Sequence, residues 1–427
     1  MEPINEQAPV LQPEVVNPPT ETPVKPAEAP KEPKVELAPI PDYVPVDVDF
    51  GIPSMYSKMP TQPTIYSGAA RIKAILENPS AYMDKLETVG GWARTVRKQK
   101  PKNEDGTAGE QLVFVELNDG SCLGSLQIVV QEQIGKESFD DILKTTTAAC
   151  IRFTGTLIKS IAAGQELEMV INDSSKHIAT VLGHNTKPGT YPLSKKAHNM
   201  ETLRQSLHIR PRSSIIGASM RLRNSISFAT HLFFQAMGFY YIHTPIITCS
   251  DCEGAGEMFG VTHIVNKEGN KDELPVQKKK KNLIDFGKDF FARRTFLTVS
   301  GQLNVEPFAC SMGNVYTFGP TFRAEQSLTS RHLAEFWMIE PEIAFGGMDE
   351  NMKCVEDYIK YCIDYCLKNN LDDLQFCNKQ NFRGKKGFDL VQYLQGILTS
   401  TFRRMTYTEG VEILQQVISF FFKTNLG

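Results

Sequence analysis

The spacing of apolar residues changes along the chain and divides it into four segments. Residues 1–65 show neither the two-residue spacing of a strand nor the spacing of about 3.6 residues of a helix. Apolar and polar residues alternate over much of residues 84–182, which predicts a β domain. A polar linker at residues 183–199 follows, and helical and strand spacings are then mixed over residues 200–427. We therefore expect an α+β protein with a tail, a β domain, a linker and a larger mixed domain.

The β domain contains five runs with strand spacing and one short helical piece. A turn signal at Asn118–Gly120 leads into the third run, and the helical piece lies near residues 139–144, after that run. Five strands with a helix between the third and the fourth are the arrangement of an OB-fold barrel, although the pattern also fits another small β barrel. The expected strands cover residues 92–97, 112–117, 122–130, 150–158 and 167–171.

The mixed domain combines helices with strands. A capping-box pattern at Thr406–Glu409 predicts the start of a final helix. The expected strands lie near residues 239–244, 296–299, 315–318 and 336–342, and a long amphipathic helix covers residues 352–367. An earlier helix is expected to place Leu222, Ile226, Ala229 and Phe233 on one face, and the final helix to bury Val411, Leu414 and Ile418.

Composition identifies the first segment as a tail. Residues 1–65 hold fifteen of the 25 prolines, and proline fixes φ and removes a backbone donor, so we expect disorder or polyproline II. Residues 1–70 hold ten acidic and four basic side chains, whereas the remainder carries a net charge of +3. This mildly basic body permits the binding of a polyanion but does not by itself argue for one.

The sequence predicts a cytoplasmic protein. It has no apolar run long enough to span a membrane, no secretory signal pattern, and an acidic start whose first arginine is Arg71. Nine cysteines in apolar surroundings predict buried thiols in a reducing compartment. Cys249 and Cys252 have the spacing of a metal pair, but no second pair or histidine cluster accompanies them, so we predict no metal site there.

The polar loop between the last two predicted strands carries the most informative chemistry. Alternation places Arg323 and Glu325 on one face of the first strand, and Phe336 lies on the returning strand. A guanidinium can bind a phosphate, a carboxylate can accept from an amino group, and an aromatic face can stack on a base, so this set suits a nucleotide. On these residues alone, an ordinary cross-strand ion pair remains open.

Longer blocks resemble the class II aminoacyl-tRNA synthetases. Residues 322–325, with Arg331, His332 and Glu335–Phe336, look like motif 2 of that family, and residues 221–245 look like motif 1, its dimer interface. Four further blocks resemble the asparaginyl enzymes in particular. These blocks are residues 208–212, 251–259, 299–304 and 404–409. The resemblance implies an N-terminal OB-fold barrel followed by an incomplete class II antiparallel-sheet catalytic domain, and it implies a homodimer.

The resemblance also implies roles for individual residues. Arg323 would hold the ATP α-phosphate and the amino-acid carboxylate and would be the catalytic residue. Glu325 and Phe336 would hold adenine. Arg331 and His332 would meet the outer phosphates of ATP and the end of the tRNA. The amino-acid pocket would be lined by Glu253, Ser300, Gln302 and Glu340.

The choice between asparagine and aspartate depends on the charge of the pocket. A second substrate carboxylate requires a cationic partner, and in the aspartyl family a lysine three residues after the pocket glutamine resembles that partner. This sequence has Val305 there, and Glu340 stands where the aspartyl family usually carries aspartate. A pocket carboxylate suits an amide ligand, whose NH2 donates, so we prefer asparagine, with aspartate as the alternative.

The barrel is expected to bind the tRNA anticodon. Phe114 is a candidate for stacking on a base, and Arg94 and Arg97 for contacts with the RNA backbone. A buried phenylalanine and two solvated arginines would fit the pattern equally well. The lysine run at residues 278–281 suggests a solvated loop more than a tRNA contact.

The family's motif 3 has no counterpart after Thr408. In the family, this motif clamps the ATP γ-phosphate, and acidic residues just before it hold Mg²⁺, so we expect the Mg²⁺ ligands to be absent from this chain. The expected function is ATP-dependent ligation of asparagine to tRNA(Asn), with these residues as a truncated form. The alternative is a non-catalytic, tRNA-binding paralogue.

Overall fold

The structure is a computed structural model of the chain. It describes residues 48–53, 68–101, 109–162, 164–193, 198–252, 254, 257–265, 274–279, 283–327, 329, 331–380 and 387–425. Most of the predicted tail lies outside these residues. The exception is the short segment at residues 48–53, where the Phe50 ring packs edge-on against Tyr361 with ring centroids 5.5 Å apart. This segment was expected in the tail but packs on the core, because Phe50 and Ile52 bring two apolar side chains to it.

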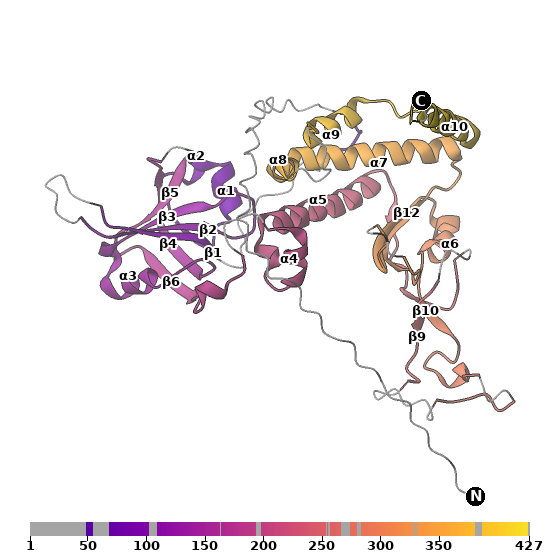
Figure 1. Cartoon of the computed structure of the whole chain (residues 1–427), viewed down its shortest axis with the longest axis horizontal. Coiled ribbons are helices and arrows are strands. Elements are labelled where there is room, and N and C mark those ends of the chain that lie inside the picture. Colours follow the sequence, from indigo (N-terminus) through magenta and orange to yellow (C-terminus); the bar gives the residue numbers. More distant parts are fainter. Residues whose placement is uncertain are drawn as a thin grey trace, which may run out of the picture. The chain divides into compact units, whose positions relative to one another are not determined.

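The β domain is a closed barrel, which confirms the OB-like prediction (Figure 1). Its strand order is β1-β2-β3-β5-β4-β6, and an additional pairing of β1 with β4 closes it. Helix α3 (Lys136–Leu143) lies between β3 and β4 in the chain, as expected. The strands are β1 (Leu86–Gln99), β2 (Leu112–Asn118), β3 (Leu126–Gln131), β4 (Cys150–Lys159), β5 (Leu167–Ile171) and β6 (Ile178–Gly183).

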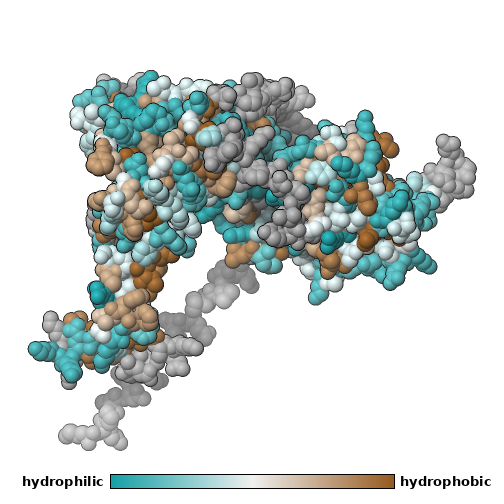
Figure 2. All heavy atoms as spheres, turned by 180° about the vertical axis from the view of Figure 1, so that it is seen from behind, coloured by the Kyte–Doolittle hydropathy of each residue, from teal (hydrophilic) through white to brown (hydrophobic). Residues whose placement is uncertain are grey.

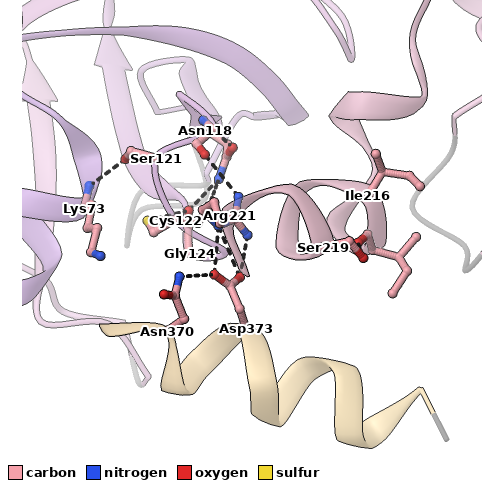
Figure 3. Close-up of polar contacts among 12 residues, drawn as sticks. Lys73, Asn118, Ser121, Cys122, Gly124, Ile216, Ser219, Arg221, Asn370 and Asp373 are labelled. Atoms are coloured by element: carbon pink, nitrogen blue, oxygen red, sulfur yellow. Dashed lines mark hydrogen bonds and ion pairs between the residues drawn. The ribbon is translucent and has the colours of Figure 1, made fainter. Parts of the chain in front are cut away.

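Alternating burial along β2 shows why this sequence forms a barrel. Val113, Val115 and Leu117 are fully buried, whereas Phe114 and Glu116 point away from the core. Two short helices, α1 (Ile72–Glu77) and α2 (Pro79–Tyr82), precede β1. The turn after β2 holds the start of α1, since the Lys73 backbone N–H donates to Ser121 Oγ at 3.0 Å (Figure 3).

The mixed domain contains two small sheets and a layer of helices. One sheet has the order β12-β11-β7 and the other β8-β10-β9. The strands are β7 (Tyr240–Tyr241), β8 (Ile247–Thr248), β9 (Gly260–Val261), β10 (Thr295–Leu297), β11 (Val315–Phe322) and β12 (Glu335–Glu342). The helices are α4 (Met200–Gln205), α5 (Ser214–Ala236), α6 (Gln302–Met312), α7 (Met348–Asn369), α8 (Leu371–Lys379), α9 (Leu390–Thr399) and α10 (Tyr407–Asn425).

An aromatic core joins the β11 strand to helices α5 and α7, which run alongside each other (Figure 1). The rings of Phe234 and Tyr316 stack with centroids 4.8 Å apart, and Phe233 lies 5.6 Å from Tyr361. His231 lies at the edge of this core and shares a hydrogen bond of 2.7 Å with the Tyr316 hydroxyl. Because these rings come from separate elements, their packing fixes the sheet relative to the helices.

A mostly buried ion pair joins α5 to α8 (Figure 3). Arg221 Nη2 lies 2.6 Å from Asp373 Oδ1, and Arg221 Nε lies 3.0 Å from Oδ2, so the guanidinium is bidentate. The Asn370 amide donates to the same carboxylate at 3.3 Å. The side chains of Arg221 and Asp373 are 19% and 7% exposed. If either were removed, little water could solvate the charge of the other.

Three predictions for this domain were wrong in detail. Ile226 of α5 is 42% exposed, although the apolar face predicted for this helix included it. The strand predicted at residues 239–244 is reduced to the two residues of β7, which pair in parallel with β11. Leu414 of α10 is 62% exposed, because no described element packs over that face of the helix, and the side chain of Ile418 lies outside the described residues.

Candidate functional site

The β11–β12 hairpin confirms the predicted antiparallel pair and presents the candidate nucleotide site at its open end. Phe322 pairs with Glu335 and Thr321 with Phe336. Strand β11 ends at Phe322, so the prediction that Arg323 and Glu325 share a strand face was wrong. Pairing continues for one more residue, since the Arg323 N–H donates to the Ala334 carbonyl at 3.1 Å. Arg323 is therefore held by the hairpin, whereas Glu325 lies in the exposed segment after it.

Arg323 is the side chain with the clearest capacity for a ligand. Its guanidinium carbon lies 5.4 Å from the centroid of the Phe336 ring, so these two predicted residues are brought together. Its Nε is buried and has no hydrogen-bond partner within the described part of the chain, where Arg323 forms no ion pair with Glu325. A buried donor without an acceptor costs about 1–3 kcal/mol, and a phosphate or carboxylate oxygen would remove that cost.

The connection between the strands carries the other predicted nucleotide contacts. Glu325, Arg331 and His332 are all exposed, and among the described residues none of them forms a hydrogen bond or ion pair with Arg323. His332 Nδ1 lies within hydrogen-bond distance of Ser327 Oγ, at 3.0 Å, and of Thr329 Oγ1. These local contacts hold the histidine to its own loop and leave the arginine in solvent.

Glu340 organises a second, adjacent group of polar residues. Ser300 Oγ donates to Glu340 Oε1, and the Gly301 N–H donates to Oε2 at 3.0 Å. The Gln302 N–H donates to Ser300 Oγ at 3.1 Å, so three of the predicted pocket residues are brought together. A Cβ on Gly301 would lie 2.8 Å from Thr317 Cγ2, which leaves room only for glycine at this position.

The structure adds two residues to this pocket that the sequence did not assign to it, Glu306 and Cys252. Gln302 Nε2 donates to Glu306 Oε1 at 2.9 Å, and the Cys252 thiol approaches Gln302 Oε1 at 3.7 Å. Glu306 lies four residues after Gln302, one helical turn away, and that spacing was a usable signal. Burial, and then the neighbouring carboxylates of Glu306 and Glu340, raise the pKa of Glu342, so three carboxyl groups lie near one another here.

Of two further predicted features of the pocket, the structure describes Val305 and does not describe Glu253. Glu253 lies outside the described residues, so its predicted contact with the substrate amino group stays a prediction. Val305 is fully buried in α6. The position where the aspartyl family carries a lysine to pair with the substrate carboxylate therefore holds no cation here. Within the described residues, no group of three histidine, cysteine, aspartate or glutamate side chains could hold a metal ion.

The outer face of the barrel brings two of the three predicted RNA contacts together. Arg97 pairs with Phe114 across β1 and β2, and its guanidinium carbon lies 5.9 Å from the Phe114 ring centroid. Both side chains line a small pocket of about 160 Å³ together with Glu116. Arg94 differs, because its Nη1 donates to the Arg212 carbonyl at 2.5 Å and its guanidinium is thereby engaged within the protein.

Comparison with known proteins identifies the family of this chain. A sequence profile described as "tRNA synthetases class II (D, K and N)" matches residues 199–420. The chain belongs to this family. The class II match covers the hairpin, the Glu340 pocket and helices α4 to α9, so the candidate nucleotide and amino-acid sites lie within it, whereas the barrel contacts at Arg97 and Phe114 lie outside it.

Two curated relatives of this class II synthetase are asparagine enzymes. The "Asparagine--tRNA ligase" of Protochlamydia amoebophila (strain UWE25) is 45% identical over 330 residues, which are 77% of this chain and 64% of that protein. That of Cytophaga hutchinsonii is 44% identical over 344 residues, which are 81% of this chain and 68% of that protein. The chain thus spans about two thirds of the length of these relatives. The resemblance to the asparaginyl enzymes is confirmed.

Solved structures agree on the fold. The asparaginyl-tRNA synthetase of Pyrococcus horikoshii, complexed with asparaginyl-adenylate, has a TM-score of 0.61 and 19% identity, over 82% of this chain and 67% of that one. The Entamoeba histolytica asparaginyl-tRNA synthetase has a TM-score of 0.57 and 23% identity, over 78% and 64%. Within the described ranges of the present chain, every helix is too short or too polar to span a lipid bilayer.

Proposed function

We propose that this class II synthetase activates asparagine with ATP and transfers it to tRNA(Asn) in the cytoplasm. The observation that carries the proposal is the guanidinium of Arg323, which is held beside Phe336 with its buried Nε unpartnered among the described residues. The asparagine relatives and the Glu340 pocket support the choice of amino acid.

Activation would proceed by positioning and charge. A carboxylate oxygen of asparagine attacks the α-phosphorus of ATP, the bond from that phosphorus to the bridging oxygen breaks, and pyrophosphate leaves. Arg323 would donate to the α-phosphate and to the attacking carboxylate, where negative charge accumulates. Phe336 would stack on adenine, and Glu325 would accept from its amino group. A terminal ribose hydroxyl of the tRNA then attacks the carbonyl carbon of asparaginyl-adenylate, and AMP leaves.

The amino acid would sit against the Glu340 group. Ser300, Gln302 and Glu253 would surround its α-ammonium, and Glu340 would lie at the floor of the pocket. Concentrated negative charge opposes a substrate carboxylate and favours an amide NH2, which is consistent with asparagine rather than aspartate. The family implies Mg²⁺, but the described residues offer no group of three ligands for it, so no step here runs through the metal.

The remaining contacts follow from the same assignment. Residues 84–182 would bind the anticodon, with Arg97 and Phe114 at the barrel pocket. A homodimer through the α5 region is supported by the exposed apolar side chains there. These are Met220, Ile226, Phe228 and Tyr240, between 41% and 58% exposed.

The test uses a non-hydrolysable asparaginyl-adenylate analogue, the asparaginyl sulfamoyl adenosine, and its aspartyl counterpart. At 100 times its Kd, a ligand that binds only the folded state stabilises it by about 2.7 kcal/mol, so the asparaginyl compound should raise the Tm by about 5–10 °C. Equal stabilisation by the aspartyl compound would refute the choice of amino acid, and no stabilisation by either would refute the proposed site.

Turnover is measured separately, by asparagine-dependent exchange of pyrophosphate into ATP. Exchange that depends on Arg323 supports catalysis by the 427 residues themselves. Analogue binding without exchange would favour the non-catalytic, tRNA-binding alternative. Arg323→Lys keeps the charge and loses the planar fork, so it is the matched control for bidentate binding.

A further inference from the structure

Glu306 is the single charged residue of α6, the helix that begins at Gln302. Its side chain is partly buried, and its Oε1 accepts a hydrogen bond from Nε2 of Gln302 at 2.9 Å. Among the described residues, no lysine, arginine or histidine forms an ion pair with it. Burial of a carboxylate without a cation costs free energy, because the charge loses part of its water. The fold alone therefore gives little reason for a carboxylate at this position.

Two further carboxyl groups lie near this one, on strand β12. Burial raises the pKa of Glu342, and the carboxylates of Glu306 and Glu340 add to that effect. Glu340 accepts from Ser300 and from the Gly301 N–H, and neither of these donors is a cation. Within the described part of the chain, none of the three carboxyl groups pairs with a basic side chain. A cationic ligand would supply the missing positive charge, and the α-ammonium of an amino acid is such a cation.

The exposed surface of α6 is otherwise mostly apolar. Leu303, Phe308 and Met312 are 38%, 44% and 44% exposed. Figure 2 shows hydrophobic side chains among hydrophilic ones over the part of the mixed domain that holds α6, at the left. A solvated helix face usually carries several charges, whereas α6 has one, and that one bonds to Gln302. The charge of Glu306 therefore indicates a specific contact rather than a contribution to solubility.

The charge of Glu306 determines which end of the Gln302 amide faces it. A carboxylate only accepts hydrogen bonds, so the NH2 of Gln302 points at Glu306 and its oxygen points elsewhere. That oxygen, Oε1, lies 3.7 Å from the sulfur of Cys252, whose thiol donates to it. Cys252 directly precedes Glu253, which the proposed function assigns to the α-ammonium of the substrate. Oε1 therefore faces the segment that leads to this assigned contact, and a carbonyl oxygen can accept a second hydrogen bond.

We propose that Glu306 is a positioning residue for amino-acid binding, which holds Gln302 by Nε2 so that Oε1 accepts from the α-ammonium of the substrate. Without Glu306, the amide is free to present its NH2 instead, and a donor cannot bind an ammonium group. A side chain that is fixed beforehand also avoids the cost of being ordered when the ligand binds. The contact with the substrate rests on the proposed function, whereas the orientation of the amide rests on Glu306.

The experiment compares the asparaginyl sulfamoyl adenosine with the same compound without its α-amino group, by calorimetric titration of the full chain. Glu306→Met keeps the length of the side chain and removes the acceptor. It should weaken binding of the amino compound about five- to ten-fold and that of the other compound by less than about two-fold. Glu306→Gln can still accept from Gln302, so its effect should be smaller. Equal weakening of both compounds by Glu306→Met would overturn the proposal, because general damage to the pocket acts on both.

Glu342→Gln is the matched control, because it removes a neighbouring carboxyl group and leaves the bond between Gln302 and Glu306 in place. If it weakens the amino compound as much as Glu306→Met does, charge alone accounts for the effect and the proposal is overturned. A double-mutant cycle tests whether Glu306 acts through Gln302. In a Gln302→Ala background, Glu306→Met should change binding by less than about two-fold, and its full effect there would also overturn the proposal.

The hold on the amide is measured without a ligand, which separates this inference from the proposed function. Solvent exchange of the side-chain NH2 protons of Gln302, followed by nuclear magnetic resonance, should be at least about ten-fold faster in Glu306→Met than in the wild type. Equal exchange rates would overturn the role of Glu306, whatever the analogues do. Faster exchange in the variant of a chain that binds neither compound would support the orientation by Glu306 and refute the proposed activity.

Discussion

Replacing Arg323 with methionine tests whether this residue is maintained for a ligand rather than for the fold. Methionine keeps most of the length and apolar stem of arginine and removes the guanidinium. In the free chain, the guanidinium has a buried Nε without a partner among the described residues, and its favourable contact is the Phe336 face.

The unpartnered Nε and the contact with Phe336 contribute to the free energy of unfolding with opposite signs. Relief of one unsatisfied buried donor should stabilise the fold by about 1–3 kcal/mol. Loss of the cation–π contact should cost about 0.5–1 kcal/mol, because the pair is partly exposed. The net expectation is that Arg323→Met stabilises the free chain by up to about 2.5 kcal/mol, which would raise the Tm of the catalytic domain by up to about 10 °C.

The assay compares urea unfolding of the wild type and of Arg323→Met, with and without the asparaginyl sulfamoyl adenosine. The variant should be the more stable protein without ligand and should lose most of the stabilisation that the analogue gives. Arg293→Met is the control, since that arginine is exposed and its loss should change stability by less than about 0.5 kcal/mol.

A variant that is destabilised by more than about 1 kcal/mol would refute the reasoning, because Arg323 would then be paired within the protein. Full retention of the response to the analogue would refute its proposed contact with the α-phosphate.

Three further predictions address the surrounding structure. Asp373→Ala should lower the free energy of unfolding in urea by about 3–5 kcal/mol, because the charge of Arg221 stays buried without its partner. Asp357→Ala, which removes a more exposed ion pair of α7, should lower it by under about 1 kcal/mol. Similar losses for the two variants would argue against burial as the cause. Gly301→Ala should destabilise by about 1–3 kcal/mol and abolish stabilisation by the analogue, and an unchanged response would show that the pocket adapts. Burial lowers the pKa of His231 below the ordinary value of 6.5. The folded state therefore favours the neutral imidazole, and the stability that this gives is fully present above pH 6.5. It is lost as the pH falls through the lowered pKa. His231→Asn should therefore flatten the decline of stability between about pH 7 and 5, and an unchanged pH profile would count against this assignment.

The sequence predicted the barrel well, because most of its strands bury one face. Val113 and Val115 alternate with Phe114 and Glu116, and such alternation defines both the strand and its inner side. Strand β6 was missed, because every residue of Ile178–Gly183 is at least partly exposed and the segment therefore has no buried face to detect. The packing of Phe50 on Tyr361 was missed for another reason, since the proline content around it outweighed two apolar side chains.

The sequence predicted which residues make up the candidate site better than it predicted their geometry. The pairing across the hairpin brings Arg323 to Phe336 as expected, but the strand ends one residue before Arg323, and side-chain alternation does not continue into a loop. The hydrogen bond from Gln302 to Glu306 depends on where α6 begins, at Gln302 itself, and periodicity alone does not give helix boundaries to one residue.

Helix α10 begins with a complete capping box, since the Thr406 N–H donates to Glu409 Oε2 at 2.6 Å and the Glu409 N–H to Thr406 Oγ1 at 3.3 Å. Most of its described apolar side chains nevertheless stay in solvent, with Leu414 62% and Val417 52% exposed. A cap defines where a helix starts, but tertiary packing supplies most of the free energy that keeps it closed. The amide protons of α10 should therefore exchange with deuterium through local opening, long before those of α5, whose Phe233 and Phe234 open only when the aromatic core does.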